Sequence, residues 1–166
     1  VVLNNDFFED LLRHTNILLK EHALHSSSDL TSKRAFELGT GWHLILPVAL
    51  YLSGIKETVT IDLNNHLRKE NLKTLLAWFI RYNQDGQLIK YLPNIEPDRI
   101  AKLQTILAET SHFSLSEILK QLHITHLIGD LTQMNLKANS FDISSSVNVL
   151  EHIHEETLPP LMKSIY

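Results

Sequence analysis

Two glycines and a later carboxylate have the residue types and the spacing of a ligand-binding site. Gly39 and Gly41 follow a short apolar run that ends at Glu37 and Leu38. A Gly-x-Gly turn between a strand and a helix lets the backbone pass close to a bound molecule. Asp62 ends the next β-branched run. A carboxylate at the end of the strand that follows the glycines, about 20 residues after them, can accept two hydrogen bonds from ribose hydroxyls. The pair predicts a site for an adenosine-type ligand, and Glu37 suits a cationic group of that ligand.

The third position of the loop separates two classes of cofactor. In the dinucleotide pattern Gly-x-Gly-x-x-Gly, the third glycine lets the helix approach and hold a pyrophosphate. This sequence has Leu44 there. S-adenosylmethionine has no pyrophosphate and offers a carboxylate, an ammonium and a sulfonium instead. Leu44 therefore favours S-adenosylmethionine, and a nucleotide-dependent oxidoreductase stays as the alternative enzyme.

These residues need strands that alternate with helices to position them. Apolar and β-branched runs predict strands over residues 34–38, 58–62, 124–128 and 141–147. Residues 42–52 predict a buried helix that starts near Leu44, because Pro47 is tolerated only in a first turn. Residues 67–80 predict another helix. The alternation indicates a doubly wound, mostly parallel, Rossmann-like α/β sheet, with its ligand beyond the carboxyl ends of the strands where the strand order reverses.

One further helical region precedes this core, and another interrupts it. Residues 4–25 have apolar side chains at helical spacing, with Asn5 or Asp6 available as a cap, and a serine-rich break follows at 26–29. Later, Pro97 opens one helix and the capping box that starts at Ser114 opens another. We therefore expect an N-terminal helix and linker over 1–33, then a partial cofactor-binding domain over 34–166 with a helical insertion at about 83–122.

The composition argues against several other classes of protein. The 166 residues include 15 Lys plus Arg and 19 Asp plus Glu, so the net charge of −4 lacks the basic excess of a nucleic-acid-binding surface. The absence of cysteine excludes disulfides, thiolate zinc sites and cysteine nucleophiles. The longest apolar run, Leu44 to Leu52, is about half of the roughly 20 residues that cross a bilayer. We expect a soluble, cytoplasmic protein with no nucleic-acid partner and no membrane span.

The histidines and tryptophans are interpreted as structural residues and not as ligands of a metal or a cofactor. The sequence holds ten histidines, but His152 and His154 would point apart on a helix, because residues two apart do not share a face. No metal ligand is therefore predicted. Trp42 and Trp78 lie in apolar helical patterns and are interpreted as core residues.

Five segments, in this order and spacing, resemble class I S-adenosylmethionine-dependent methyltransferases. They are Glu37 to Gly41, Thr60 to Asp62, Gly129 to Leu131, Ser140 to Asp142, and Asn148 to Ile153. The Phe-Asp and Leu-Glu-His-Ile signatures within them are most similar to the small-molecule branch, also called the type 11 or ubiquinone-biosynthesis-like group. No Asn-Pro-Pro-Tyr motif of amino-group methylation is present. The resemblance implies S-adenosylmethionine as cofactor and methyl transfer to a small-molecule acceptor.

The resemblance also implies roles for the residues of the glycine loop. Gly39 and Gly41 would pass under the methionine part of the cofactor, with Thr40 between them. Glu37 would support the loop and reach the ligand ammonium through water. Asp62 would hold the ribose.

Roles for the later strand ends follow from the same resemblance. Asp130 would contact the adenine amino group, and Leu63 and Leu131 would sandwich the adenine ring. Asn148 and Val149 would lie beside the methionine and the sulfonium. No catalytic base follows, so the catalytic residues stay unassigned.

The sequence departs from the family pattern at three places. His43 stands where many members have a third glycine, two residues beyond Gly41, which predicts a tighter loop. The helical stretch between Gly86 and Leu122 is longer than the family core, and it would emerge either near the cofactor mouth or on the opposite face. The chain starts without Met and ends at Tyr166, before the last three strands of the family. We therefore expect either a truncated chain or a disordered remainder, and we expect ligand binding rather than catalysis from the residues present.

Alternatives to these assignments stay open. Asp62 and Asp130 have a structural interpretation as caps of a helix or turn. A degenerate methyltransferase-like scaffold, which binds partners without a cofactor, is the non-enzymatic alternative. The sequence does not specify the methyl acceptor or the oligomeric state.

Overall fold

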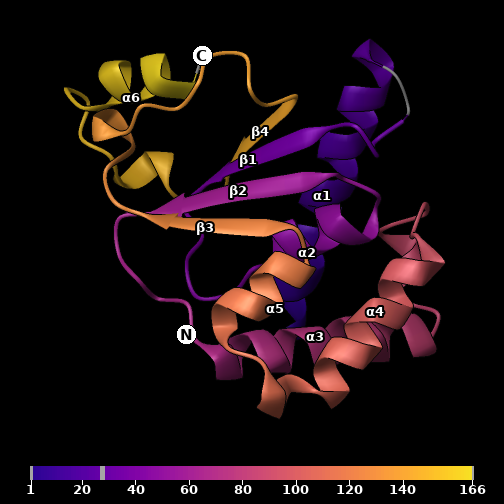
Figure 1. Cartoon of the computed structure of the whole chain (residues 1–166). Coiled ribbons are helices and arrows are strands. Elements are labelled where there is room, and N and C mark those ends of the chain that lie inside the picture. The colour runs from indigo at the N-terminus through magenta and orange to yellow at the C-terminus, as the bar shows by residue number, and fades with distance from the viewer. Residues whose placement is uncertain (1, 27–28, 166) are drawn as a thin grey trace.

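The computed structural model describes residues 2–26 and 29–165 of the chain, with side chains up to residue 163. Two residues of the predicted serine-rich break, 27 and 28, lie outside the described part. In chain order (Figure 1) the elements are α1 (Asn5–His25), β1 (Arg34–Leu38), α2 (Ile45–Leu52), β2 (Glu57–Asp62), α3 (Lys69–Gln84), η1 (Leu88–Lys90), α4 (Pro97–Ala108), η2 (Thr110–His112), α5 (Leu115–Gln121), β3 (Ile124–Ile128), η3 (Leu131–Gln133), β4 (Ile143–Ser146), η4 (Leu150–His152) and α6 (Leu158–Ile165).

The four strands form one parallel sheet in the order β3-β2-β1-β4. β1 pairs with β2 on one side and with β4 on the other, so the strand order reverses between β1 and β4. The predicted parallel α/β fold with helices flanking the sheet is therefore confirmed. Strands β1 and β3 have the predicted bounds, whereas β4 is shorter than the predicted 141–147, because Phe141 and Val147 lie outside the ladder.

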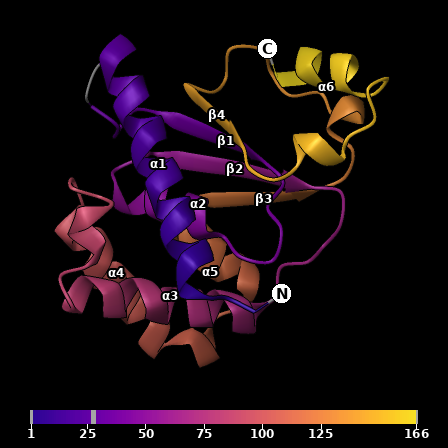
Figure 2. The ribbon, with the colours of Figure 1, turned by 180° about the vertical axis from the view of Figure 1, so that it is seen from behind.

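Helices cover both faces of the sheet (Figures 1 and 2). On one face, Ala35 of β1 and Ile143 of β4 pack against α2, which shares its core with α1, α3, α4 and α5. On the other face, Phe36 of β1 and Val59 of β2 pack with Leu161 of α6. Because successive side chains of a strand point to opposite faces, alternate residues of β1 belong to the two separate clusters.

Local sequence signals explain where three of the helices begin. α1 is capped by Asn4, whose side chain accepts a hydrogen bond from the N–H of Phe7 at 2.9 Å, so the predicted cap at Asn5 or Asp6 is wrong by one or two residues. α2 begins at Ile45 and places Pro47 in its first turn, as predicted, because those N–H groups have no partner within the helix. The capping box at the start of α5 is confirmed, with Ser114 and Glu117 exchanging hydrogen bonds.

The helical insertion lies away from the carboxyl ends of the strands (Figure 1). Arg99 of α4 donates hydrogen bonds to the carbonyl oxygens of Tyr51 at 2.5 Å, Gly54 at 3.1 Å and Ile55 at 2.6 Å. Tyr51 lies in the last turn of α2, and Gly54 and Ile55 connect that helix to β2, so α4 is held at the end of the sheet where β2 begins. The insertion therefore emerges away from the cavity, whose described lining includes no residue of 83–122. No helix among the described residues is long and apolar enough to cross a bilayer.

Candidate functional site

A cavity of about 880 Å³ lies at the carboxyl ends of the strands. It is lined by residues that follow β1 and β4, the two strands between which the strand order reverses. That is the position expected for a ligand in an open parallel sheet. All ten predicted cofactor contacts line it, namely Glu37, Gly39, Thr40, Gly41, Asp62, Leu63, Asp130, Leu131, Asn148 and Val149. The fold thus gathers residues that are spread over more than 100 positions of the sequence.

Gly39 allows two turns to approach each other closely at the cavity. Its φ is +92°, and a Cβ atom at this position would lie 2.0 Å from Cγ2 of Val149. Its N–H donates to the carbonyl oxygen of Ile61 at 2.8 Å, which ties the loop to β2. Gly41 has a φ of +60°, but a Cβ atom there would meet no atom within 4 Å. The two glycines therefore serve different purposes, close packing at Gly39 and backbone conformation at Gly41.

Asp62 joins the end of β2 to the glycine loop. Its Oδ2 accepts a hydrogen bond from the N–H of Gly41 at 2.8 Å, and its Oδ1 accepts one from the N–H of Asn64 at 3.0 Å. The next helix, α3, begins at Lys69 with Arg68 at its N-cap, so Asp62 does not cap that helix. Each carboxylate oxygen can accept a further hydrogen bond, and these open positions can serve hydroxyl groups of a ligand.

Glu37 is a buried carboxyl at the floor of the cavity, with 6% of its surface exposed. Thr60, its neighbour across β1 and β2, donates a hydrogen bond from Oγ1 to Oε2 at 2.8 Å. Burial raises the pKa of Glu37 to about 8 against the opposing effect of the Thr60 hydrogen bond, and the charge of Asp62 adds to the rise. At neutral pH the carboxyl of Glu37 is therefore mostly protonated in the ligand-free protein.

A row of polar side chains extends from Glu37 across the sheet beneath the glycine loop. Thr60 pairs in register with Glu37 on one side and with His126 on the other. Oγ1 of Thr40 lies 2.6 Å from Oγ1 of Thr60 and 3.3 Å from Nδ1 of His126. Burial lowers the pKa of His126, which keeps the ring neutral. Sequence reasoning missed His126, although the two-residue period of β3 could have placed it on this face.

The later strand ends supply the rest of the predicted set. Asp130 is the N-cap of η3, where Oδ1 accepts hydrogen bonds from the N–H of Thr132 at 2.9 Å and from its hydroxyl at 2.7 Å. The capping interpretation of Asp130 is therefore confirmed, and Asp130 lines the cavity as well. Leu131 is buried, whereas Leu63 is 68% exposed at the rim. Asn148 has a φ of +56°, which turns the chain after β4 toward Gly39.

Several lining residues were not predicted from the sequence. Trp42 is 39% exposed and stacks on His66, with ring centroids 4.8 Å apart and an angle of 22° between the ring planes. The interpretation of Trp42 as a core residue is wrong, because α2 begins at Ile45 and leaves Trp42 in the loop. Its position directly after the glycine pair is the signal that could have identified it. Trp78, by contrast, packs edge-on against Phe8 in the helical core, with ring centroids 5.4 Å apart.

His152 and His154 also line the cavity. The helix considered for them in the sequence is only the short η4 turn, which ends at His152. Within the described part of the chain, no group of three or more His, Cys, Asp or Glu side chains is arranged to hold a metal ion.

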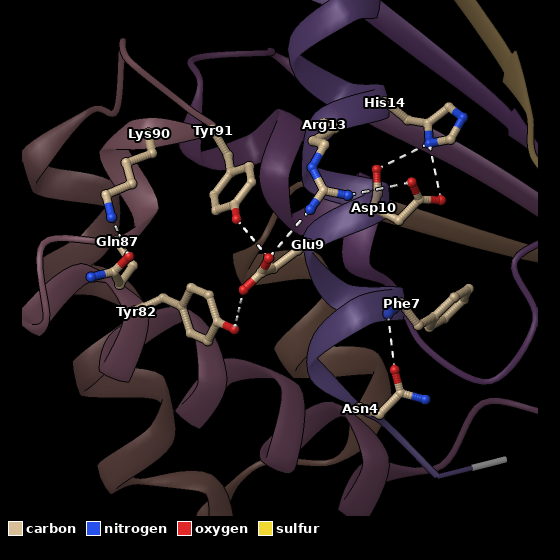
Figure 3. Close-up of polar contacts among 10 residues, drawn as sticks. All are labelled: Asn4, Phe7, Glu9, Asp10, Arg13, His14, Tyr82, Gln87, Lys90 and Tyr91. Atoms are coloured by element: carbon tan, nitrogen blue, oxygen red, sulfur yellow. Dashed lines mark hydrogen bonds and ion pairs between the residues drawn. The ribbon is translucent and has the colours of Figure 1, made fainter.

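Helix α1 forms one wall of the cavity through Phe7 and Leu11. Besides its apolar packing, the helix is tied to its neighbours by Glu9, which accepts hydrogen bonds from the hydroxyls of Tyr82 at 3.0 Å and Tyr91 at 2.7 Å (Figure 3). Arg13 of the same helix adds an ion pair to Glu9 at 3.3 Å. The hydrogen bonds from Tyr91 and Tyr82 lower the pKa of Glu9, so the carboxylate stays ionised at neutral pH.

Replacing Glu9 is expected to loosen α1 without loosening the sheet. In Glu9→Ala the two tyrosine hydroxyls lose their shared acceptor, and the amides of α1 should exchange with solvent faster than in the unchanged protein. The amides of β1 and β2 should keep their protection. Hydrogen exchange measured by mass spectrometry checks this, with Glu21→Ala, an exposed carboxylate on the same helix, as the control. Equal exchange of α1 in both variants would show that Glu9 does not hold the helix.

The side chains that line the cavity bear on the two cofactor classes considered for the sequence. Its lining includes three carboxyl groups, from Glu37, Asp62 and Asp130, and no described lining residue is Lys or Arg. The helix after the loop is also poorly placed for a phosphate, because α2 begins only at Ile45 and Pro47 removes one N–H group of its first turn. The arrangement favours a ligand with cationic groups over a pyrophosphate.

Comparison with known proteins yields no match of this chain to a protein-family model, to a curated protein or to a solved structure.

Proposed function

We propose that this chain binds S-adenosylmethionine and serves methyl transfer to a small-molecule acceptor. The observation that carries the proposal is the joining of a Gly-x-Gly loop with the carboxyl groups of Glu37, Asp62 and Asp130 in one cavity whose described lining has no Lys or Arg. Its volume of about 880 Å³ is in the upper part of the range for small-molecule sites, roughly 300–1,000 Å³. A cofactor with an ammonium, a sulfonium and a ribose fits this set of groups.

The residues of the cavity would divide the binding between them. The backbone of Gly39 and Gly41 would face the methionine part, and Asp62 would accept hydrogen bonds from the ribose hydroxyls through its open acceptor positions. Glu37 lies beneath the loop with one carboxyl oxygen engaged by Thr60. Its other oxygen would be available to the ligand ammonium.

The remaining positions would hold the base and the sulfonium. Asp130 keeps Oδ1 in the turn of η3, which leaves Oδ2 for the adenine amino group. Leu63 and Leu131 would lie on the two faces of the adenine ring. Asn148 and Val149 would lie beside the methionine and the sulfonium.

The cofactor would supply an electrophilic methyl group for in-line attack by an acceptor atom. Chemistry of this type depends mainly on alignment of the reacting atoms, so the contribution of the chain is to position both molecules and to exclude water. Phe7 and Leu11 of α1 and Trp42 of the loop offer apolar surface in the same cavity, which supports a largely apolar acceptor. We propose the cytoplasm as the compartment, as expected from the sequence.

Binding of S-adenosylhomocysteine is the first expected result. At a concentration one hundred times its dissociation constant, the ligand should raise the free energy of unfolding by about 2.7 kcal/mol. Asp62→Ala should weaken binding by about 10- to 100-fold, because hydrogen bonds to a charged group contribute about 1.5–3 kcal/mol. Isothermal titration calorimetry on the whole chain measures both. The control is Asp98→Ala, which removes a carboxylate from the first turn of α4.

Three outcomes would contradict the proposal. Absence of S-adenosylhomocysteine binding would favour the scaffold alternative, and binding of NAD in its place would favour the oxidoreductase. Undiminished binding by Asp62→Ala would show that the ligand lies outside the strand-end cavity.

A further inference from the structure

The carboxyl of Glu37 has one oxygen committed to the protein and one left for a ligand. Oε2 accepts the hydrogen bond from Thr60, and Thr60 is itself held by Thr40 and through it by His126. Oε1 has no hydrogen bond from a described residue, and Glu37 lines the cavity. The row of hydroxyls therefore fixes the orientation of the carboxyl and presents Oε1 to whatever occupies the cavity.

No described group in the cavity balances a negative charge on Glu37. The titratable side chains that line the cavity with it are Asp62 from β2, Asp130 after β3, and His43, His66, His152 and His154. His126 of β3 reaches the row through Thr40 and is kept neutral by burial. The walls from α1 and from the turn after β4 contribute uncharged residues such as Phe7 and Val147. An ionised Glu37 would thus face Asp62 without a cation of its own.

We propose that a ligand of this cavity brings a cationic group to Oε1 of Glu37 and that its binding releases the carboxyl proton of Glu37 to solvent. The inference rests on the proposed function, because the ammonium of the S-adenosyl amino acid is the cation it assigns to Glu37. In the exchange, the O–H bond of the carboxyl breaks, the proton goes to a buffer base, and an ion pair forms between the carboxylate and the ammonium. No covalent bond to the ligand forms.

The buried position of Glu37 makes this exchange measurable at neutral pH. Because burial raises the pKa of Glu37 to about 8, the carboxyl holds its proton at pH 7 until a cation arrives. A nearby positive charge lowers the pKa of a carboxyl. The association constant should therefore rise about tenfold for each unit of pH between roughly 6 and 7.5, and level off above pH 8.

The number of protons released is the quantity that tests the inference. Calorimetry at pH 7 in buffers of different ionisation enthalpy should give close to one proton released per S-adenosylhomocysteine bound. Methylthioadenosine has the same nucleoside and thioether but no ammonium, so its binding should release none. Glu37→Gln keeps the shape of the side chain without the proton and should release none with either ligand. Glu109→Gln, an exposed carboxylate at the end of α4, is the matched control and should behave as the unchanged chain.

Failure of this inference is distinguishable from failure of the proposed function. If S-adenosylhomocysteine binds without proton release, or if Glu37→Gln releases as many protons as the unchanged chain, the inference is wrong and the proposed function stands. If neither ligand binds, both are wrong. The comparison of the two ligands uses the unchanged chain, so the inference is decided even if Glu37→Gln does not fold.

Discussion

Gly39→Ala is expected to lower the free energy of unfolding by about 3 kcal/mol and to remove measurable binding of S-adenosylhomocysteine. The new Cβ atom would lie 2.0 Å from Cγ2 of Val149, and the backbone at Gly39 has a φ of +92° that L residues rarely adopt. Overpacking costs about 1–3 kcal/mol and a strained positive φ adds about 1–2 kcal/mol. Relief of the contact would push apart the two turns that line the cavity. Urea unfolding measures the first effect and calorimetry the second.

Gly41→Ala is the matched control for this prediction. A Cβ atom at Gly41 meets nothing within 4 Å, so its cost is limited to the positive φ, about 1 kcal/mol. Adding Val149→Ala to Gly39→Ala removes the clashing methyl groups and should recover part of the lost stability. Equal losses for Gly39→Ala and Gly41→Ala would show that the approach of Val149 does not govern the loop.

Glu37→Gln is expected to flatten the dependence of stability on pH. The folded chain holds the Glu37 proton up to a pKa of about 8, whereas an unperturbed Glu has a value of 4.5. Between these values the folded state binds one more proton than the unfolded state, so the contribution of Glu37 is complete below pH 4.5 and is lost as the pH rises through 8. The loss is about 5 kcal/mol. Gln has no proton to lose. The free energy of unfolding of Glu37→Gln, relative to that of the unchanged chain, should therefore rise by that amount between pH 4.5 and 8.

Urea denaturation at a series of pH values measures this difference. Because the histidines titrate in both proteins, their contribution cancels when the two curves are subtracted. Glu109→Gln should give a curve parallel to that of the unchanged chain, since Glu109 is exposed. A curve for Glu37→Gln that is also parallel would show that Glu37 is ionised in the folded protein at neutral pH.

The predicted elements that agree with the structure are those whose signals are local. Pro47 determines the late start of α2 because a proline ring excludes the preceding helical turn. Ser114 and Glu117 determine the start of α5 because they satisfy each other's backbone groups. β4 ends before the predicted Val147 because the chain turns at Asn148, which has a positive φ, and Val149 then packs beside Gly39, a residue far away in the sequence.

The wrong assignment in the site has the same physical origin. Trp42 matched an apolar helical pattern, but pattern alone does not reveal that the loop after Gly41 runs over the cavity and presents the ring to His66. Likewise, nothing local marks Phe7 and Leu11 as cavity residues, because α1 reaches the cavity through its packing on the helical core and its hydrogen bonds with Tyr82 and Tyr91.

By itself, the amino-acid sequence determined the parallel α/β class of fold and the strand ends at which the candidate residues lie, and it predicted a cofactor without pyrophosphate. Those properties follow from side-chain periodicity, helix caps and the absence of a third glycine, which act over a few residues. Only the tertiary structure decided that the ten candidate residues line one cavity, that Glu37 is buried beside Thr60 and Asp62, and that the helical insertion lies away from the cavity. The charge state of Glu37 depends on the tertiary structure, because a pKa is set by burial and by neighbours that the chain brings together only when it folds.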